Sequence, residues 1–264
     1  MTPATVTAPT PVRPWRARVW GASAVLVLSV VATALLLASV HRGDGITLWD
    51  GPTLTWMLAH RAPVATNVLT VVSMFGPGVY YWSSAIVVFV LFAIRRRWIE
   101  ALLFAVALVS ADTVSRLMKQ AVQRARPPAA VVLGPLEPSF AFPSGHTIAA
   151  AAFALALAYL WWRARPGRLR AVIGLVLALA VTAVMATSRL YLADHWLTDV
   201  LASTVLAFGV MALVVLLDIY LELRFPSRSG GGHPVATLPG LSAQGRKRTT
   251  ASATLPGEQH PTGR

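Results

Sequence analysis

The sequence predicts an all-α, polytopic membrane protein with six transmembrane helices around a helical core bundle. Three observations carry this prediction. The 264 residues are 56% hydrophobic and only 12% charged, which is about half the charged fraction of a typical soluble domain. The apolar residues gather in blocks of about 17–25 residues, the length that crosses a bilayer as a helix. Short clusters of arginine lie beside these blocks, as they do in membrane proteins with a fixed orientation.

The first span is predicted at residues 19–40. Arg13, Arg16 and Arg18 precede it. A signal peptide begins in the same way, but this apolar block is too long for one and no clear cleavage site follows. We therefore interpret it as a retained transmembrane helix. Residues 1–18, rich in Pro, Thr and Ala, are predicted to form a disordered cytoplasmic tail.

The segment 46–78 is expected to lie outside the main bundle. Asp50-Gly51-Pro52 indicates a helix start with Asp50 as its cap, and residues 53–60 indicate a short interfacial helix. Residues 64–75 are apolar, but Gly76-Pro77-Gly78 interrupts them. We expect a hairpin-like or surface element here. A single long, kinked span that starts at residue 64 is the alternative.

The later spans follow from hydropathy alone. The second to sixth are predicted at residues 79–94, 98–118, 147–162, 171–187 and 196–220. A polar, proline-rich segment separates the third span from the fourth. Residues 19–224 would then form one membrane domain. Residues 225–264, rich in Gly, Ser, Pro and Thr, would form a disordered cytoplasmic C-tail.

The basic residues predict the orientation. With six spans, both termini share one side with the arginine-rich turns at 95–97 and 163–170. Most of the 23 Lys and Arg residues fall on that side, which should be the cytoplasm. The net charge of +13 therefore indicates contact with anionic lipid, and we exclude nucleic acid as a partner. The absence of cysteine excludes disulfides, thiol nucleophiles and cysteine-ligated metals.

Polar groups gather at the span ends on the opposite, outer side. They are Lys119, Arg124, Arg126, His146, Arg189, Asp194, His195 and Asp199. Ionisable groups at membrane depth are candidates for function because they are costly to place there. Each has a plainer alternative, such as a cation that reaches to the interface or a polar helix start. Those alternatives do not explain why all of these residues share one side.

Two local patterns indicate chemistry on phosphate. Pro143-Ser144-Gly145-His146 begins the fourth span, where Ser144 is a good helix cap and free N–H groups favour an anion. His195 and Asp199 are four residues apart, so on a helix their side chains are neighbours. A carboxylate that accepts from one imidazole nitrogen leaves the other as an aimed lone pair, which a nucleophilic histidine needs.

These pieces resemble a known signature. Lys119 is followed after six residues by Arg126-Pro127, then comes Pro143-Ser144-Gly145-His146, and Ser188-Arg189 precedes His195 and Asp199. In residue type, order and spacing they resemble the three-part signature of the type 2 phosphatidic acid phosphatase superfamily. The motifs cover residues 119–199, and the six-helix pattern extends the resemblance to about 19–224.

The resemblance implies catalytic roles for three residues. His195 would be the nucleophile and form a phosphohistidine. Asp199 would orient it and stabilise its charge. His146 would protonate the leaving oxygen and later help water to hydrolyse the intermediate.

The resemblance also implies a phosphate-binding set. Lys119, Arg126 and Arg189 would hold the phosphoryl oxygens, and Ser144 with the Gly145 N–H would stabilise charge in the transition state. No metal or cofactor is implied, because the cations do the work that Mg²⁺ does elsewhere.

The implied activity is hydrolysis of a lipid phosphate or diphosphate at the outer face of a bacterial plasma membrane. A polyprenyl diphosphate of the undecaprenyl type is the leading substrate, followed by phosphatidate and phosphatidylglycerol phosphate. Two alternatives stay open. Related vanadium-dependent haloperoxidases use the same anion site but are typically soluble, and a catalytically inactive, lipid-binding membrane protein would keep the fold without turnover.

The sequence departs from the family pattern at a few positions. Members often have Gly-Val or another small pair before the nucleophile, where this chain has Ala193-Asp194. We expect Asp194 to be a solvated loop acid; a carboxylate that raises the pKa of His195 or binds a substrate hydroxyl is the alternative. Ser203 replaces a frequent glycine and is expected to affect only helix packing. Arg124 lies inside the first motif without being part of it, and the motif predicts no role for it.

Overall fold

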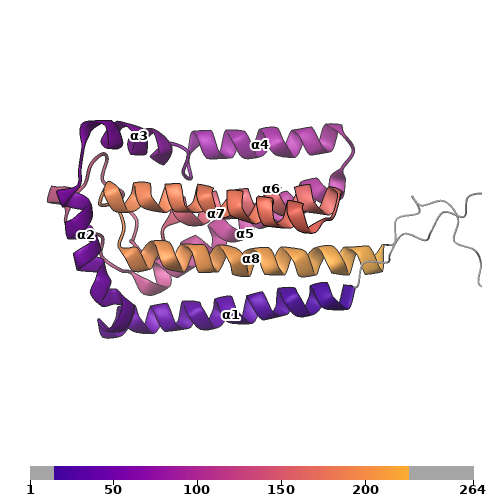
Figure 1. Ribbon diagram of the computed structural model, residues 1–264, viewed down its shortest axis with the longest axis horizontal. Helices are drawn as coiled ribbons and strands as arrows, with labels where there is room; N and C mark the ends of the chain where they lie inside the picture. The colour runs from indigo at the N-terminus through magenta and orange to yellow at the C-terminus, as the bar shows by residue number, and fades with distance from the viewer. Residues whose placement is uncertain (1–14, 226–264) are drawn as a thin grey trace, which may run out of the picture. The chain divides into compact units, whose positions relative to one another are not determined.

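The computed structural model describes residues 15–225, which fold into eight α-helices and two short 3₁₀ turns without a strand (Figure 1). In chain order they are α1 (Trp15–Arg42), η1 (Gly45–Trp49), α2 (Asp50–Ala59), α3 (Pro63–Ser73), α4 (Val79–Ile94), α5 (Trp98–Val122), η2 (Ala129–Val131), α6 (Gly145–Ala164), α7 (Arg168–Tyr191) and α8 (Leu197–Arg224). The predictions of disorder at 1–14 and 226–264 lie outside the described residues. The helix α1 already includes residues 15–18, which the sequence assigned to the tail.

The prediction of an all-helical membrane bundle is confirmed. Five of the described helices are long and apolar enough to cross a membrane by length and composition: α1, α5, α6, α7 and α8. The remaining expected span, α4, is apolar but has 16 residues. It is therefore about 24 Å long, somewhat short of a hydrocarbon core of about 30 Å.

The core lies where α6 meets α5, α7 and α8, while α1 packs along α8 and α4 along α5. Small residues allow these helices to approach closely, as in other membrane bundles. A Cβ at Gly174 of α7 would lie 3.2 Å from the Cβ of Ala158 on α6. A Cβ at Gly209 of α8 would lie 3.1 Å from the Cβ of Ser29 on α1.

One end of the bundle is covered by α2, and α3 lies along its flank. The helix α2 runs across the ends of the long helices, and α3 lies against α7 (Figure 1). Gly76-Pro77-Gly78 separates α3 from α4, so the expected interruption is confirmed, while the choice between a surface element and one long, kinked span stays a prediction. The prediction that Asp50 caps its own helix is also wrong, because Trp49 is the N-cap residue of α2.

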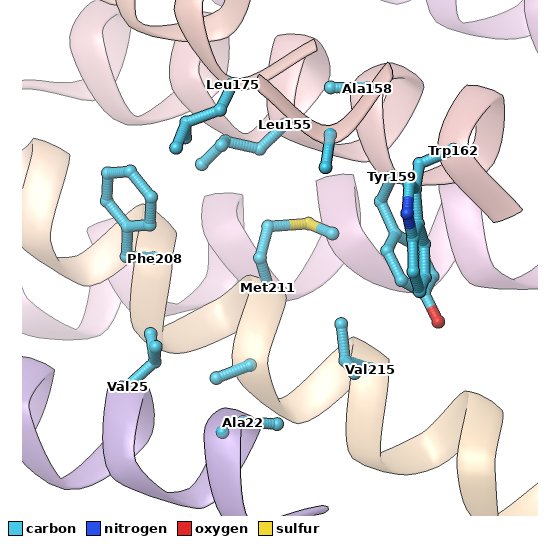
Figure 2. A pocket seen from close by; sticks show the side chains of 13 residues that line it. Ala22, Val25, Leu155, Ala158, Tyr159, Trp162, Leu175, Phe208, Met211 and Val215 are labelled. Carbon is cyan, nitrogen blue, oxygen red and sulfur yellow. The ribbon is translucent and has the colours of Figure 1, made fainter. Parts of the chain in front are cut away.

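The other end of the bundle carries a buried charge cluster and an apolar cavity. The carboxylate of Asp218 on α8 is fully buried and accepts hydrogen bonds from Arg18, Tyr159 and Arg163 at 2.5–3.2 Å. Beside it, a cavity of about 300 Å³ lies between α1, α6, α7 and α8. Apolar side chains such as Met211 point into the cavity (Figure 2). None of the predicted site residues lines it.

Candidate active site

The predicted site residues converge at the end of the bundle that α2 crosses. Lys119 comes from the last turn of α5, and Arg126 from the segment that follows. His146 lies in the first turn of α6, and Arg189 in the last turn of α7. Electrostatic interactions join His146 to His195 and to all three of these cations. The structure therefore brings the three motifs into one cluster of side chains.

His195 lies between a carboxylate and a guanidinium. Its side chain is almost fully buried, with Nδ1 3.4 Å from Oδ2 of Asp199 and Nε2 3.3 Å from the Nη1 of Arg126. A guanidinium can only donate, so the contact with Arg126 assigns the lone pair to Nε2. The proton then belongs to Nδ1 and faces Asp199. This is the tautomer that a histidine nucleophile attacking through Nε2 requires.

Asp199 is held by two donors at the start of α8. Its Oδ2 accepts the backbone N–H of Trp196 at 2.9 Å, which closes a capping box at the helix start. Its Oδ1 accepts a hydrogen bond from Nη1 of Arg124 at 2.5 Å. The carboxylate is fully buried, so these donors replace the water that would otherwise solvate it.

The expectation that Asp194 is a solvated loop acid is wrong. Asp194 is 4% exposed and its Oδ2 lies 2.9 Å from the Nη2 of Arg189. Burial raises the pKa of this carboxyl, and the charges of Arg189 and Arg126 oppose that shift. Local sequence did not reveal the pairing because Ala193 turns the chain with φ of +63°, a left-handed conformation that favours glycine. This turn takes Asp194 back toward the end of α7.

Arg189 and Lys119 are tied to other parts of the same cluster. Arg189 also donates to the hydroxyl of Ser73 at the end of α3, and its buried Nε has no acceptor among the described residues. The ammonium of Lys119 donates to the carbonyl of Phe140. Oxygen atoms of other segments thus hold both cations in place.

Arg126 is anchored by neutral oxygens. Its Nε donates to the carbonyl of Ser139 at 2.7 Å, and Nη1 donates to the carbonyl of Asp194 at 2.8 Å. Burial lowers the pKa of Arg126, and the nearby carboxylates of Glu137 and Asp194 oppose this. A guanidinium keeps its proton at any working pH despite such a shift, so Arg126 remains a fixed cation beside His195.

The start of α6 confirms the expected cap. The oxygen of Ser144 accepts from the N–H and the hydroxyl of Thr147, at 3.4 and 3.0 Å. Ser203 of α8 is more than a packing residue, because its hydroxyl lies 3.0 Å from the carbonyl of Ser144 and 2.7 Å from that of Asp199. A direct role of Ser144 and Gly145 on a phosphoryl group stays a prediction.

The turn between α3 and α4 lies directly on His146. A Cβ placed on Gly76 would lie 2.5 Å from Cγ of His146 and nearer still to Cδ2 and Nε2. Carbon atoms normally keep about 3.5–4.0 Å apart, so Gly76 is required for this close approach. The turn between α3 and α4 is thereby part of the surroundings of His146.

Sequence reasoning missed Gly76, Ser73 and Asp50 as site residues. Their contacts are with residues far along the chain: Gly76 meets His146, Ser73 meets Arg189, and Asp50 meets Arg124. The one available signal was a glycine pair around a proline, which indicates a turn but not what lies beneath it.

The surroundings of His195 keep it neutral. Burial lowers its pKa well below the usual value, and the positive charges of Arg126, Arg189 and Lys119 lower it further. A neutral imidazole retains its lone pair. The cluster can therefore present a nucleophilic nitrogen beside fixed cations, which is an arrangement suited to an oxyanion.

Comparisons with known proteins show which proteins the chain resembles. Residues 100–221 match the model of the PAP2 superfamily. Phosphatidylglycerophosphatase B of Escherichia coli strain K12 is 42% identical over 77 residues, which is 29% of this chain and 28% of that protein. The match thus spans less than a third of that relative's length. Phosphatidylglycerophosphatase B of Bacillus subtilis strain 168 is 26% identical over 183 residues, 68% of this chain and 88% of the relative.

A solved structure shares the fold. The crystal structure of a transmembrane PAP2-type phosphatidylglycerolphosphate phosphatase from Bacillus subtilis superposes with a TM-score of 0.68 at 24% identity. The superposition covers 76% of this chain and 98% of that one. Residues 100–221, which include the motifs at 119–199, thus match a PAP2 superfamily domain, in agreement with the resemblance.

Proposed function

We propose that this protein is a lipid phosphatase that releases phosphate from a membrane lipid phosphate or diphosphate through a phosphohistidine intermediate. The observation that carries the proposal is the environment of His195. Its Nδ1 faces the carboxylate of Asp199, and its Nε2 faces the guanidinium of Arg126. An activated nitrogen beside a cation is what attack on a phosphoryl group requires.

In the first step, Nε2 of His195 attacks phosphorus and forms a P–N bond. The bond between phosphorus and the leaving lipid oxygen breaks, and that oxygen takes a proton from His146, which enters this step protonated because the negative charge of the bound phosphate offsets the nearby cations. Asp199 stabilises the imidazolium that forms, as the carboxylate does in other histidine-based sites. Because the leaving group departs with the proton of His146, no charged alkoxide has to be released.

In the second step, His146, now neutral, takes a proton from water as the water oxygen attacks phosphorus. The P–N bond breaks and its electron pair returns to Nε2 of His195. Inorganic phosphate leaves, and both histidines regain their starting protonation states. General acid and general base roles of one residue in successive steps follow from microscopic reversibility.

Lys119, Arg126 and Arg189 would hold the phosphoryl oxygens. The buried Nε of Arg189, which has no acceptor within the described part of the chain, supports this assignment, because a phosphoryl oxygen would satisfy it. Ser144 and the Gly145 N–H at the positive end of α6 would add charge stabilisation. These groups supply positive charge without a metal, so the reaction should continue in the presence of a chelator.

The distribution of basic residues supports an extracytoplasmic site with both termini in the cytoplasm. Arg95, Arg96, Arg97 and Arg168 lie at the opposite end of the bundle from His195, and a membrane protein keeps such clusters inside. Phosphatidylglycerol phosphate is the first substrate to test, because the similar proteins bear that name. Polyprenyl diphosphate and phosphatidate complete the panel.

The experiment is phosphate release from this panel by purified protein in detergent or liposomes, with and without chelator. H195A should lower kcat by several powers of ten, each worth about 1.4 kcal/mol of barrier. H41A is the matched control, because His41 is exposed and its hydrogen bond within residues 15–225 is to the carbonyl of Leu37 in its own helix. Wild-type turnover by H195A would refute the proposal, as would a failure of the wild type to hydrolyse any lipid phosphate.

A further inference from the structure

We propose that Asp50 and Arg124 are positioning residues that hold Asp199, and through it His195, in the geometry for nucleophilic attack. This inference rests on the proposed function and adds to it two residues that are not signature residues of any of the three motifs. Asp50 also lies outside residues 100–221, which match the family model.

Arg124 joins two carboxylates that are far apart in sequence. Its Nη1 donates to Oδ1 of Asp199 at 2.5 Å and to the hydroxyl of Thr198 at 2.6 Å. Its Nη2 donates to Oδ2 of Asp50, also at 2.5 Å. A guanidinium offers its donors in a rigid fork, so the position of one carboxylate constrains that of the other.

Asp50 fastens the start of α8 independently of Arg124. Its Oδ1 accepts the backbone N–H of Thr198 at 2.9 Å, and its Oδ2 accepts the hydroxyl of Thr198 at 2.8 Å. A carboxylate at the start of a helix satisfies free N–H groups and favours the helix dipole. Asp50 therefore caps the helix that carries Asp199, although it belongs to α2.

The network is almost closed to water. The side chains of Arg124, Asp50 and Asp199 are 13%, 6% and 0% exposed, and the guanidinium of Arg124 also lies 5.7 Å from the ring centroid of Trp196. Buried charges depend on their partners because water cannot replace them. Loss of either partner would therefore leave the carboxylate of Asp199 free to move, because water could not take the place of the lost contact.

The consequence for His195 follows from how the oxygens of Asp199 are used. Arg124 occupies Oδ1, so Oδ2 is left to face Nδ1 of His195. If Arg124 is displaced, the carboxylate can turn and the Nδ1–H loses its acceptor. The tautomer with a lone pair on Nε2 is then no longer favoured. The expected defect is thus in kcat, with substrate binding retained.

The test variant is D50N, which keeps the size of the side chain and an oxygen for Thr198 but removes the charge that holds Arg124. We expect kcat to fall at least tenfold with KM changed less than threefold. D44N is the matched control, because Asp44 pairs with Arg42 in an exposed ion pair, and it should retain full activity. Unchanged kcat in D50N would overturn the proposal.

A double-mutant cycle separates positioning from general destabilisation. If Asp50 acts through Asp199, D50N should cause little further loss of kcat in a D199N background. An equal fold-loss in both backgrounds would mean that Asp50 acts independently of Asp199 and would also overturn the proposal.

A third measurement does not depend on turnover. Nitrogen NMR of isotope-labelled histidine should report the Nδ1–H tautomer for His195 in the wild type and its partial loss in D50N. The same tautomer in both would contradict the inference. If the wild type hydrolyses no lipid phosphate, the proposed function fails by itself, and this spectrum still decides whether Asp50 and Arg124 position His195.

Discussion

Replacing Gly76 with alanine tests whether the turn between α3 and α4 sets the position of His146. Gly76 does not have a positive φ among the described glycines, so alanine fits its backbone without strain. The added methyl group, however, would meet the imidazole ring of His146. G76A is therefore a steric probe of the proposed general acid, made at a residue outside the three motifs.

The expected loss follows from the distances. The new Cβ would lie 2.5 Å from Cγ of His146 and nearer to two other ring atoms, whereas about 3.5 Å is the closest comfortable approach. The ring or the turn must then move by roughly 1 Å or more. A displacement of about 1 Å at a catalytic group costs on the order of 100-fold in rate, or about 2.7 kcal/mol of barrier.

The assay is kcat for lipid phosphate hydrolysis, with thermal unfolding measured on the same preparation. G78A is the matched control. Gly78 is two residues away in the same turn, its extended φ of −162° suits any residue, and a Cβ there would have only the carbonyl oxygen of Gly76 at 3.8 Å as a neighbour. A folded G76A protein with a kcat within threefold of G78A would refute the assignment of Gly76 and the role of His146.

Two further predictions concern the charges around the nucleophile. Burial and neighbouring cations lower the pKa of His195, so its neutral form persists as the pH falls. After allowing for ionisation of the substrate phosphate, the midpoint of the acid limb of kcat/KM should therefore lie below pH 6.5. A midpoint above pH 6.5 would contradict this. D194A leaves Arg189 as a buried cation without its carboxylate, so the free energy of unfolding should fall by about 3–5 kcal/mol. A free energy of unfolding in detergent equal to that of the wild type would show that the pair is dispensable.

Hydropathy predicts the membrane bundle well because the lipid-facing residues leave a local signal. The bounds of α4 were predicted to the residue, and those of the other long helices within a few residues. Some helices extend beyond the apolar block by about one turn of polar residues. The turns that contain Lys119 on α5 and Arg189 on α7 are examples. Polar residues at these ends are stabilised by the cluster, which no local window detects.

Motif spacing predicts which residues meet but not how they are held. His195 and Asp199 share a helix start, so their contact follows from a separation of four residues. The role of Asp50 depends instead on α2 crossing the end of α8, and its partner Thr198 lies 148 residues away. A long-range contact of this kind has no local sequence signal, and the carboxylate therefore resembled an ordinary cap.

The most direct measurement is the capture of phosphate on the protein during turnover. A lipid substrate with a radiolabelled phosphoryl group would be mixed briefly with the wild type, and the reaction stopped in alkali, where a P–N bond survives. We predict label on the peptide that contains His195 in the wild type, and none in H195A. Turnover without any bound label, or label on a different residue, would contradict the central claim that His195 is the nucleophile.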